Sequence, residues 1–456
     1  MIKSELEDLQ EMDLSTSDSK YFAYSTQLDI TSERESSILQ LYENWDEELK
    51  FYFNSQGNKK LIGIGSVKIL TFQEGFNEEL FHNKISRIKK QVVNIGKTKN
   101  NIIWFGGQSF DDFIKLRSDW EEWGVIYYFL PRINIVMENS SNAQITIIYD
   151  RISNEDYEQY FRDVLHKIET LLDIEPKTQK NTISKLIYET PKPEWINYVR
   201  TGLGYISENI VDKIVLSRIR SYEINSIQYS KILHDLEDSY PETFVFDMQL
   251  RSNNHFFAAS PELLLRVKNK IVETYALAGS INRGTSTEED KKLADELFNS
   301  SKNRSEHQFV IDDIISKLGM FTSDIKFSQS PKIIKLKNIQ HLKTEITATL
   351  LDDYSINHLV SLLHPTPALA GLPSDKAKSL IRDIETHDRG WYGGPIGWFD
   401  SEGNGEMIVA IRSALQKERK LILYSGAGIV KDSIPEFEWE ETKIKFYTIQ
   451  RLFEQL

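Results

Sequence analysis

The segment that closes the chain places charged side chains where a helix should be apolar. We expect a helix from about Ile434 to the C-terminus, and Glu438, Glu441 and Lys445 then fall on its inward, apolar face because residues three and four apart are neighbours on a helix. A carboxylate on an inward face needs a partner, since an unpaired buried charge is costly. Two interpretations stay open here: an ion pair between Glu441 and Lys445 on a solvated turn, or a face that binds a ligand.

A second helix, expected over Asn303–Leu318, repeats this anomaly. Glu306 falls in line with Val310 and Ile314, in the stripe that should pack inward. Two inward carboxylates from distant segments indicate a hard cation held between two helices. Oxygen ligands with open positions for water and substrate suit Mg²⁺ better than zinc. The adjacent His307 is interpreted as a core histidine or a neighbour of the site, because no other metal-binding residue stands at a spacing that would let the two share a metal ion.

Two further polar residues stand beside strand-like runs. Lys213 opens the apolar run 213–218, where it is either an edge-strand lysine or a base with a lowered pKa. Glu262 follows Pro261 in a turn between two apolar runs. It is either a solvated turn residue or a partly desolvated carboxyl whose raised pKa makes it a proton donor.

Two glycine-rich segments are compatible with a close approach of the backbone to a ligand. Residues 426–428 (Gly-Ala-Gly) follow an expected strand, but the third glycine of a dinucleotide site is missing and no alternating strand–helix units surround them. Nucleotide binding is therefore disfavoured. Residues 393–397 (GGPIG) fit either a tight turn or a ligand contact.

The elements that must position these residues are mostly strands. Strands are expected over 61–70, 102–105, 124–130, 144–149, 213–219, 243–250, 256–259, 263–267 and 271–278. A further helix is expected over 154–172. Strands in hairpin order with helices between them favour a mixed, mainly antiparallel α+β fold. Length alone suggests two or three domains. Along the chain we distinguish a polar leader over 1–20, a part over 21–190 and a part over 191–456, with a junction at the prolines of 189–195.

Composition excludes several classes of protein. The chain has 55 basic and 68 acidic residues and a net charge of −13, without the clustered cations that nucleic-acid binding requires. It has no cysteine, which excludes disulfides, thiolate nucleophiles and sulfur-ligated metal sites. No apolar run is long enough to span a membrane, and the N-terminus lacks a signal peptide. We expect a cytoplasmic protein and, by default, a monomer.

Nine short segments carry a resemblance to a known family when they are read in order. They are KIVLSR (213–218), SPELL (260–264), ALAGS (276–280), KNRSEH (302–307), IQHL (339–342), HPTPALAGLP (364–373), YGGPIGWFD (392–400), AIRSA (410–414) and SGAGIVKDSIPEFEWEETKIK (425–445). In this order they resemble the chorismate-binding enzymes, which include isochorismate synthases, salicylate synthases, anthranilate synthase component I and aminodeoxychorismate synthases. The resemblance covers about residues 195–450, whereas the first 190 residues match only loosely.

The resemblance implies a single large α+β domain with two packed, mainly antiparallel sheets and flanking helices, in place of several domains. It implies Mg²⁺ bound by Glu306 and Glu441, with Glu438 nearby. The substrate would be chorismate, whose two carboxylates suit one cation and two basic side chains. The implied substrate-binding residues are Arg412 and Lys445 together with the backbone around Gly279, Ser280, Ala368 and Gly426.

Within the superfamily the sequence looks most like the isochorismate synthases. These place a lysine at the start of the KIVLSR strand, so that Lys213 would deprotonate a water that attacks C2 while Glu262 protonates the departing C4 hydroxyl. Aminodeoxychorismate synthases often carry a nucleophilic lysine where this chain has Ala278. The sequence departs from the family at Ile281, since members often read AGTRPRG and this chain lacks the first arginine.

Alternatives remain at this stage. Salicylate synthases share Lys213 and Glu262 and then eliminate pyruvate, and the sequence separates them poorly from isochorismate synthases. An aminating relative is disfavoured, and a protein that binds chorismate or Mg²⁺ without catalysis could dispense with either residue. Whether the product serves quinone (menaquinone), siderophore or salicylate metabolism stays open.

Overall fold

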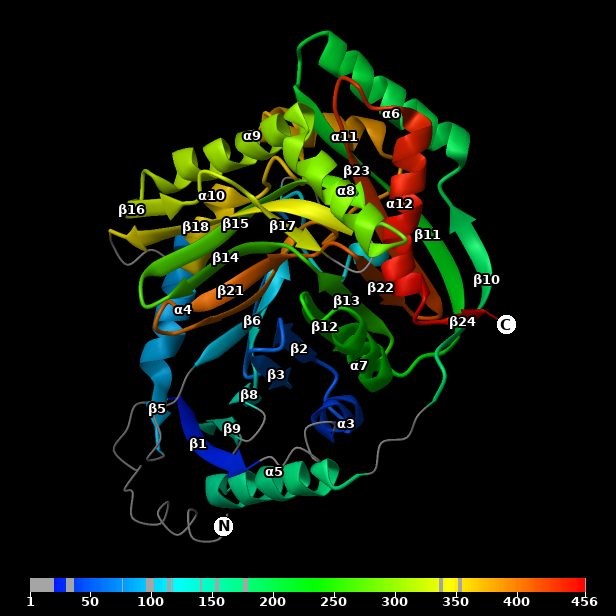
Figure 1. Ribbon diagram of the computed structural model, residues 1–456. Coiled ribbons are helices and arrows are strands. Elements are labelled where there is room, and N and C mark those ends of the chain that lie inside the picture. The colour runs from blue at the N-terminus through cyan, green and yellow to red at the C-terminus, as the bar shows by residue number, and fades with distance from the viewer. Residues whose placement is uncertain are drawn as a thin grey trace.

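The computed structural model describes residues 20–29, 37–75, 77–95, 102–112, 116, 118–139, 142–151, 156–174, 179–335, 339–351 and 355–455. The polar leader expected over 1–20 therefore lies, apart from Lys20, outside the described residues. The described chain forms a single α+β unit in which two large sheets pack together and helices cover the outside (Figure 1). The predicted fold class is confirmed.

The first sheet contains both the earliest and the last strands of the described chain. Its neighbouring strands are, in order, β24 (Glu454–Gln455), β10 (Thr182–Glu189), β11 (Lys213–Ser226), β23 (Lys420–Ile429), β22 (Ser413–Lys417), β13 (Asn254–Ser260), β12 (Phe244–Arg251), β2 (Lys50–Ser55), β3 (Lys60–Ile64), β8 (Ile133–Asn139), β9 (Asn142–Asp150), β1 (Tyr21–Asp29) and β5 (Val92–Asn94), with β19 (Gly371–Leu372) on β11. Among the described strands of this sheet, only the β1–β5 and β10–β24 pairs are parallel.

The second sheet is antiparallel throughout its described strands. Its order is β16 (Thr322–Phe327), β18 (Ile339–Leu350), β15 (Ile271–Asn282), β14 (Leu263–Lys268), β21 (Gly405–Val409), β20 (Pro395–Asp400), β6 (Ile103–Gln108), β7 (Ile126–Leu130) and β4 (Lys68–Phe72), with β17 (Lys332–Lys335) on β18. Strands from before and after residue 190 pair in both sheets, β2 with β12 and β6 with β20. Backbone hydrogen bonds thus join the two parts into one domain.

Helices surround the two sheets (Figure 1). Their bounds are α3 (Ser37–Asn44), α4 (Glu78–Gln91), α5 (Tyr157–Leu172), α6 (Lys192–Ser207), α7 (Tyr229–Ser239), α8 (Thr287–Asn299), α9 (Ser301–Leu318), α10 (Ile356–Leu363), α11 (Ser374–Ile384) and α12 (Pro435–Gln450). Ser300 caps α9 by accepting a hydrogen bond from the backbone N–H of Asn303. Proline opens α12 at a position where its missing N–H costs nothing. These caps fix where the two acid-bearing helices begin.

The strand predicted over 61–70 is wrong in one respect. The chain forms two strands there, β3 and β4, which belong to different sheets. Gly65 separates them with a φ of +62°, a backbone conformation that glycine adopts without strain. The helix predicted over 154–172 begins only at Tyr157, because the Asp156 side chain accepts hydrogen bonds from the first turn and caps it.

Between the sheets lies a large apolar core rich in aromatic side chains. Trp104, Trp120, Trp123 and Trp391 are each no more than 1% exposed. Burying an aromatic side chain of this size contributes about 2–3 kcal/mol. This core fixes the two sheets relative to each other. Within the described part of the chain, no helix has the length and apolarity to cross a membrane.

Candidate active site

Two of the short segments that lead from one sheet to the other lie side by side. The first crossover runs from Ser260, the end of β13, to Leu263, the start of β14. The second runs from Val409, the end of β21, to Ser413, the start of β22. The Ser260 hydroxyl donates a hydrogen bond to the carbonyl of Val409 at 2.5 Å. Each crossover therefore holds the other in place.

Each crossover carries one of the predicted site residues. Glu262 lies in the first, and the N–H of Val409 donates a hydrogen bond to its backbone carbonyl at 3.0 Å. Arg412 lies in the second with a φ of +53°. That conformation is strained for a residue with a side chain, and such strain is concentrated at functional sites. The fold thus holds both side chains at the junction of the two sheets.

A cavity of about 220 Å³ lies at this junction, and we call it the polar pocket. All the predicted catalytic, substrate-binding and metal residues line it or the adjoining neck. The residues of the polar pocket are Lys213, Pro261, Glu262, Leu277, Ala278, Gly279, Ser280, Asn303, Glu306, His341, Ala368, Ile411, Arg412, Gly428, Val430, Ser433, Glu438, Glu441 and Lys445. A smaller cavity of about 90 Å³, the neck, continues from it past Glu262 and includes Gly426.

Lys213 reaches the polar pocket from the first residue of β11. Its Nζ donates to Glu306 on α9 at 2.6 Å, and its side chain is only 10% exposed. Gly428 leaves room for this side chain. A Cβ at position 428 would lie 2.9 Å from Lys213 Cε. A side chain at position 428 would therefore displace the end of the Lys213 side chain.

A second ion pair lies on α12. Lys445 Nζ bonds to Glu441 at 2.6 Å and donates to the backbone carbonyl of Gly426 at 2.8 Å. Burial raises the pKa of Glu441, but Lys445, Arg412 and Lys213 outweigh it and the net pKa is lowered. Glu441 is therefore ionised at neutral pH. The ion pair left open by the sequence exists, but it faces the polar pocket.

Glu262 differs from Glu441 because its carboxyl stays partly protonated at neutral pH. Its side chain is buried, with 8% of the residue exposed. Burial raises its pKa from 4.5 to about 7, although Lys213, Lys445 and Arg412 oppose the change. A carboxyl with this pKa is poised to donate a proton at neutral pH.

Polar groups on the β15 side complete the pocket. Gly279, with a φ of +76°, forms a bulge that shifts the register of β15 on β18. After the bulge, Ser280 Oγ lies 2.8 Å from Nδ1 of His341. Burial lowers the pKa of His341 to about 3, so its imidazole is neutral. Neutral donors and acceptors thus accompany the charged groups.

Sequence reasoning missed several lining residues, notably Asn303, His341 and Ser433. Their positions depend on pairing and packing far along the chain, although all three residues lie inside the segments that carried the family resemblance. His307 lines no part of the polar pocket. Its Nε2 lies 2.8 Å from Thr344 Oγ1, and burial lowers its pKa to about 4. The interpretation of His307 as a core histidine agrees with this position.

The carboxylates of the polar pocket suit a hard cation in their chemistry. Glu306, Glu438 and Glu441 offer oxygen atoms from two helices to one cavity. Within the described ranges, no three acidic or histidine side chains are already grouped closely enough to hold a metal ion. Glu306 and Glu441 instead accept hydrogen bonds from lysines. A cation would replace these ammonium groups as the partner of the same oxygens.

Comparison with known proteins agrees with this geometry. The sequence profile of the family described as chorismate binding enzyme matches residues 7–454. The isochorismate synthase MenF of Bacillus subtilis is 32% identical over 405 residues, which cover 87% of this chain and 85% of the relative. The isochorismate synthase DhbC of the same organism is 38% identical over 290 residues, 61% of this chain and 72% of that protein. In fold, the chain is similar to the structure of Escherichia coli MenF, with a TM-score of 0.81, 22% identity and coverage of 99% of this chain and 100% of that one.

Proposed function

Because this chain belongs to the chorismate-binding enzyme family, we propose that it is an isochorismate synthase whose base is Lys213 and whose acid is Glu262. The observation that carries the proposal is that both side chains line one small pocket with Arg412 and Lys445. A displacement of hydroxide by water requires a general base and a general acid, and lysine and glutamic acid can serve in these roles. The activity is that of an isomerase.

Substrate binding rests on the cationic side of the pocket. Chorismate carries two carboxylates, and Arg412 and Lys445 are placed to bind one of them through charge-assisted hydrogen bonds. Burial lowers the pKa of Arg412, yet a guanidinium stays charged at any physiological pH. The bulge at Gly279 and the backbone beside Ser280 and Ala368 bring further polar groups to the ring.

The reaction exchanges one hydroxyl for another. Lys213, acting in its amine form, accepts a proton from a water molecule as the oxygen of that water forms a bond to C2. The C4–O bond breaks, Glu262 gives its proton to the departing oxygen, and the ring double bonds shift between the two carbons. One water is consumed and one released, so the product is an isomer of the substrate. Lys213 then returns its extra proton, and Glu262 regains one, through water.

Glu306, Glu438 and Glu441 are the residues that would hold Mg²⁺. The ion would supply positive charge against the second carboxylate of chorismate, which three glutamates would otherwise repel. Ala278 lines the same pocket and offers no amine, so a covalent amine route through this position is closed. We further propose that the protein is cytoplasmic and monomeric. Size-exclusion chromatography with light scattering tests the monomeric state.

The product of chorismate tests the proposal directly. Purified protein is incubated with chorismate and Mg²⁺, and the products are separated by liquid chromatography, with Lys213→Ala as the matched inactive variant. Isochorismate formed only by the unaltered protein supports an isochorismate synthase. Salicylate together with pyruvate indicates a salicylate synthase instead. Binding without turnover indicates a protein that only holds chorismate.

A further inference from the structure

A cluster of basic side chains lies outside the active site, in the N-terminal part of the chain. It surrounds a cavity of about 480 Å³, which we call the basic pocket. This volume is in the range of cavities that hold small organic ligands. The described lining of the basic pocket consists of Lys20, Tyr21, Lys68, Ile69, Leu70, Lys84, Arg87, Ile88 and Gln91.

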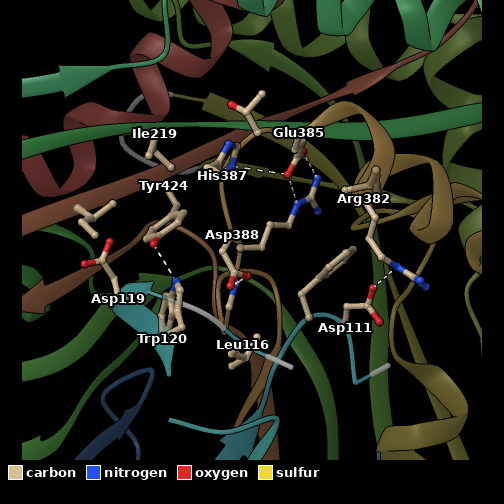
Figure 2. Close-up of a pocket in the computed structure, with 16 residues that line it drawn as sticks. Asp111, Leu116, Asp119, Trp120, Ile219, Arg382, Glu385, His387, Asp388 and Tyr424 are labelled. Carbon is tan, nitrogen blue, oxygen red and sulfur yellow. Dashed lines mark hydrogen bonds and ion pairs between the residues drawn. The ribbon is translucent and has the colours of Figure 1, made fainter. Parts of the chain in front are cut away.

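The basic pocket is separate from the active site. Its described lining ends at Gln91, whereas the described lining of the polar pocket starts at Lys213. A third cavity, of about 610 Å³ beside α11 (Figure 2), lacks this independence, because it shares Arg389 and Tyr424 with the neck. A ligand in the basic pocket therefore contacts none of the residues assigned to chorismate.

One face of α4 forms a wall of the basic pocket. Figure 1 shows this helix at the left edge of the molecule, with β5 and β1 beside its lower end. Lys84 is three, four and seven residues before Arg87, Ile88 and Gln91, so the four side chains lie along a single stripe of the helix. Ile88 is buried, whereas Lys84 and Arg87 are exposed. The stripe thus presents two cations beside an apolar floor.

The other walls come from β4 and from the start of β1. β4 is an edge strand of the second sheet, and its Lys68 and Leu70 point to the same face because they are two residues apart. The backbone N–H of Lys20 donates a hydrogen bond to the carbonyl of Gln91, the last residue of α4, at 3.1 Å. This bond holds Lys20 beside the helix. Cations from three segments of the chain therefore line one cavity.

The described lining has a positive surplus. It contains no carboxylate and four cations: Lys20, Lys68, Lys84 and Arg87. Within the described part of the chain, none of these four forms an ion pair with an acidic side chain. Lys20 and Lys84 instead lie 5.3 and 5.5 Å from the ring centres of Tyr21 and Phe72. Asp150, the cross-strand neighbour of Tyr21 on β9, is not part of the lining.

This surplus determines the kind of ligand that the pocket accepts. Like charges around one concavity repel one another and raise the local concentration of anions, although the chain as a whole has a net charge of −13. Lysine binds phosphate oxygens as a point charge, and arginine binds them through two parallel hydrogen bonds. A diphosphate group carries several negative charges on neighbouring oxygens. It can therefore contact cations from more than one wall at once.

We propose that the basic pocket is a second binding site, for a small molecule that carries a diphosphate group. Its oxygens bind Lys84 and Arg87 on α4 and Lys68 on β4, and Lys20 contributes further positive charge. This site is independent of the chorismate reaction, so its existence does not depend on the function proposed above.

Inorganic pyrophosphate is a suitable probe because it consists of the diphosphate group alone. Its binding to the full chain is titrated by phosphorus NMR without Mg²⁺, which would compete for the probe, and orthophosphate is titrated in parallel. We expect pyrophosphate to bind with a Kd on the order of 1 mM, as its few heavy atoms allow. Orthophosphate has fewer charges and should bind about three-fold more weakly or worse. Equal affinity of the two, or no saturable binding of pyrophosphate, overturns the proposal.

Adenosine diphosphate distinguishes two sources of the diphosphate group. Ile69 and Ile88 give the pocket an apolar surface beside its cations, against which an organic group can pack. A lower Kd for adenosine diphosphate than for pyrophosphate supports the site and assigns it to an organic diphosphate. An equal or higher Kd supports a site for pyrophosphate itself.

Two double variants locate the probe. Lys68→Gln with Arg87→Gln removes one cation from each of two walls, at positions that are exposed. It should raise the Kd of pyrophosphate about five-fold or more, at the strength of partly exposed ion pairs. Lys291→Gln with Lys376→Gln, an equal charge change at exposed positions on α8 and α11, is the matched control and should leave the Kd unchanged.

The same titrations define the results that refute the site. An unaltered Kd in the first double variant, or an equal rise in the control, shows that the probe senses only the net charge of the protein. Arg412→Gln should leave the Kd unchanged, and a rise as large as in the first double variant places the probe in the polar pocket instead. Thermal unfolding curves check that the variants fold, and Lys84→Gln replaces the first double variant if that one does not.

Discussion

Replacing Glu262 by glutamine should stabilise the protein while it removes the proposed proton donor. The pKa of this residue is about 7 in the folded protein against 4.5 for an ordinary glutamate. A pKa difference of this size means that the charged carboxylate costs about 3 kcal/mol of folding free energy at pH 8. The value already includes the attraction of the neighbouring cations. Glutamine has nearly the same shape and carries no charge, so Glu262→Gln should recover this free energy.

The effect of Glu262 on the free energy of unfolding depends on pH, and its direction follows from the raised pKa. The folded protein holds the Glu262 proton more tightly than the unfolded chain, so this residue lowers stability progressively as pH rises from 4.5 through about 7. The difference in unfolding free energy between Glu262→Gln and the unaltered protein should therefore grow by about 2–3 kcal/mol between pH 5 and pH 8. In activity, kcat/KM of the unaltered protein should fall above about pH 7, where the acid form is lost.

Urea unfolding at the two pH values measures the effect, with metal and substrate absent so that ligand binding does not contribute. Glu242→Gln, at an exposed position before β12, is the matched control and should follow the unaltered protein at both values. The argument that burial dominates at Glu262 is refuted if the difference in unfolding free energy between Glu262→Gln and the unaltered protein is the same at both pH values. The same here means within about 0.5 kcal/mol, the usual error of such extrapolations.

Three further predictions concern the polar pocket. Lys213→Ala should lower kcat by about 10²- to 10⁴-fold, the usual contribution of a base, while chorismate binding measured by calorimetry changes little; substantial turnover would remove the lysine from its role. Glu306→Ala should raise the Mg²⁺ concentration for half-maximal activity roughly ten-fold or more, and an unchanged titration curve would exclude it as a ligand. Gly428→Ala brings a Cβ to 2.9 Å from Lys213 Cε and should lower kcat by about 10²-fold, as a displacement of a reacting group does, with a nearly unchanged Tm; normal activity would show that Lys213 needs no such room.

Regular amphipathic segments were predictable because their information is local. The spacing of Glu438, Glu441 and Lys445 requires only a helix, and α12 covers all three residues. Glu306 follows in the same way from α9. The hairpin turn at Asn269 and Lys270 has two positive φ values, as the two-residue turn between β14 and β15 requires.

Other features depend on contacts between distant residues, which a single sequence does not reveal. The residues next to Arg412 do not predict its left-handed backbone conformation. Only the family resemblance identified Arg412 as a candidate site residue. The run 61–70 reads as one strand by composition, yet Gly65 divides it between two sheets. The cavity beside α11 brings Asp119 together with Asp388 and Tyr424, which lie more than 260 residues later in the chain.

The two crossovers have a consequence for how the protein loses activity. Glu262 and Arg412 belong to neither sheet but to the connections between them, so neither sheet by itself carries a working constellation. A sub-ångström shift of one sheet over the other would leave the strands, and therefore the circular dichroism spectrum, intact. The same shift would separate Glu262, the proposed proton donor, from Arg412, the proposed carboxylate-binding residue. Turnover is thus more sensitive than circular dichroism to the relative position of the two sheets. Substitutions in the tryptophan-rich core should therefore lower the activity before they unfold the protein.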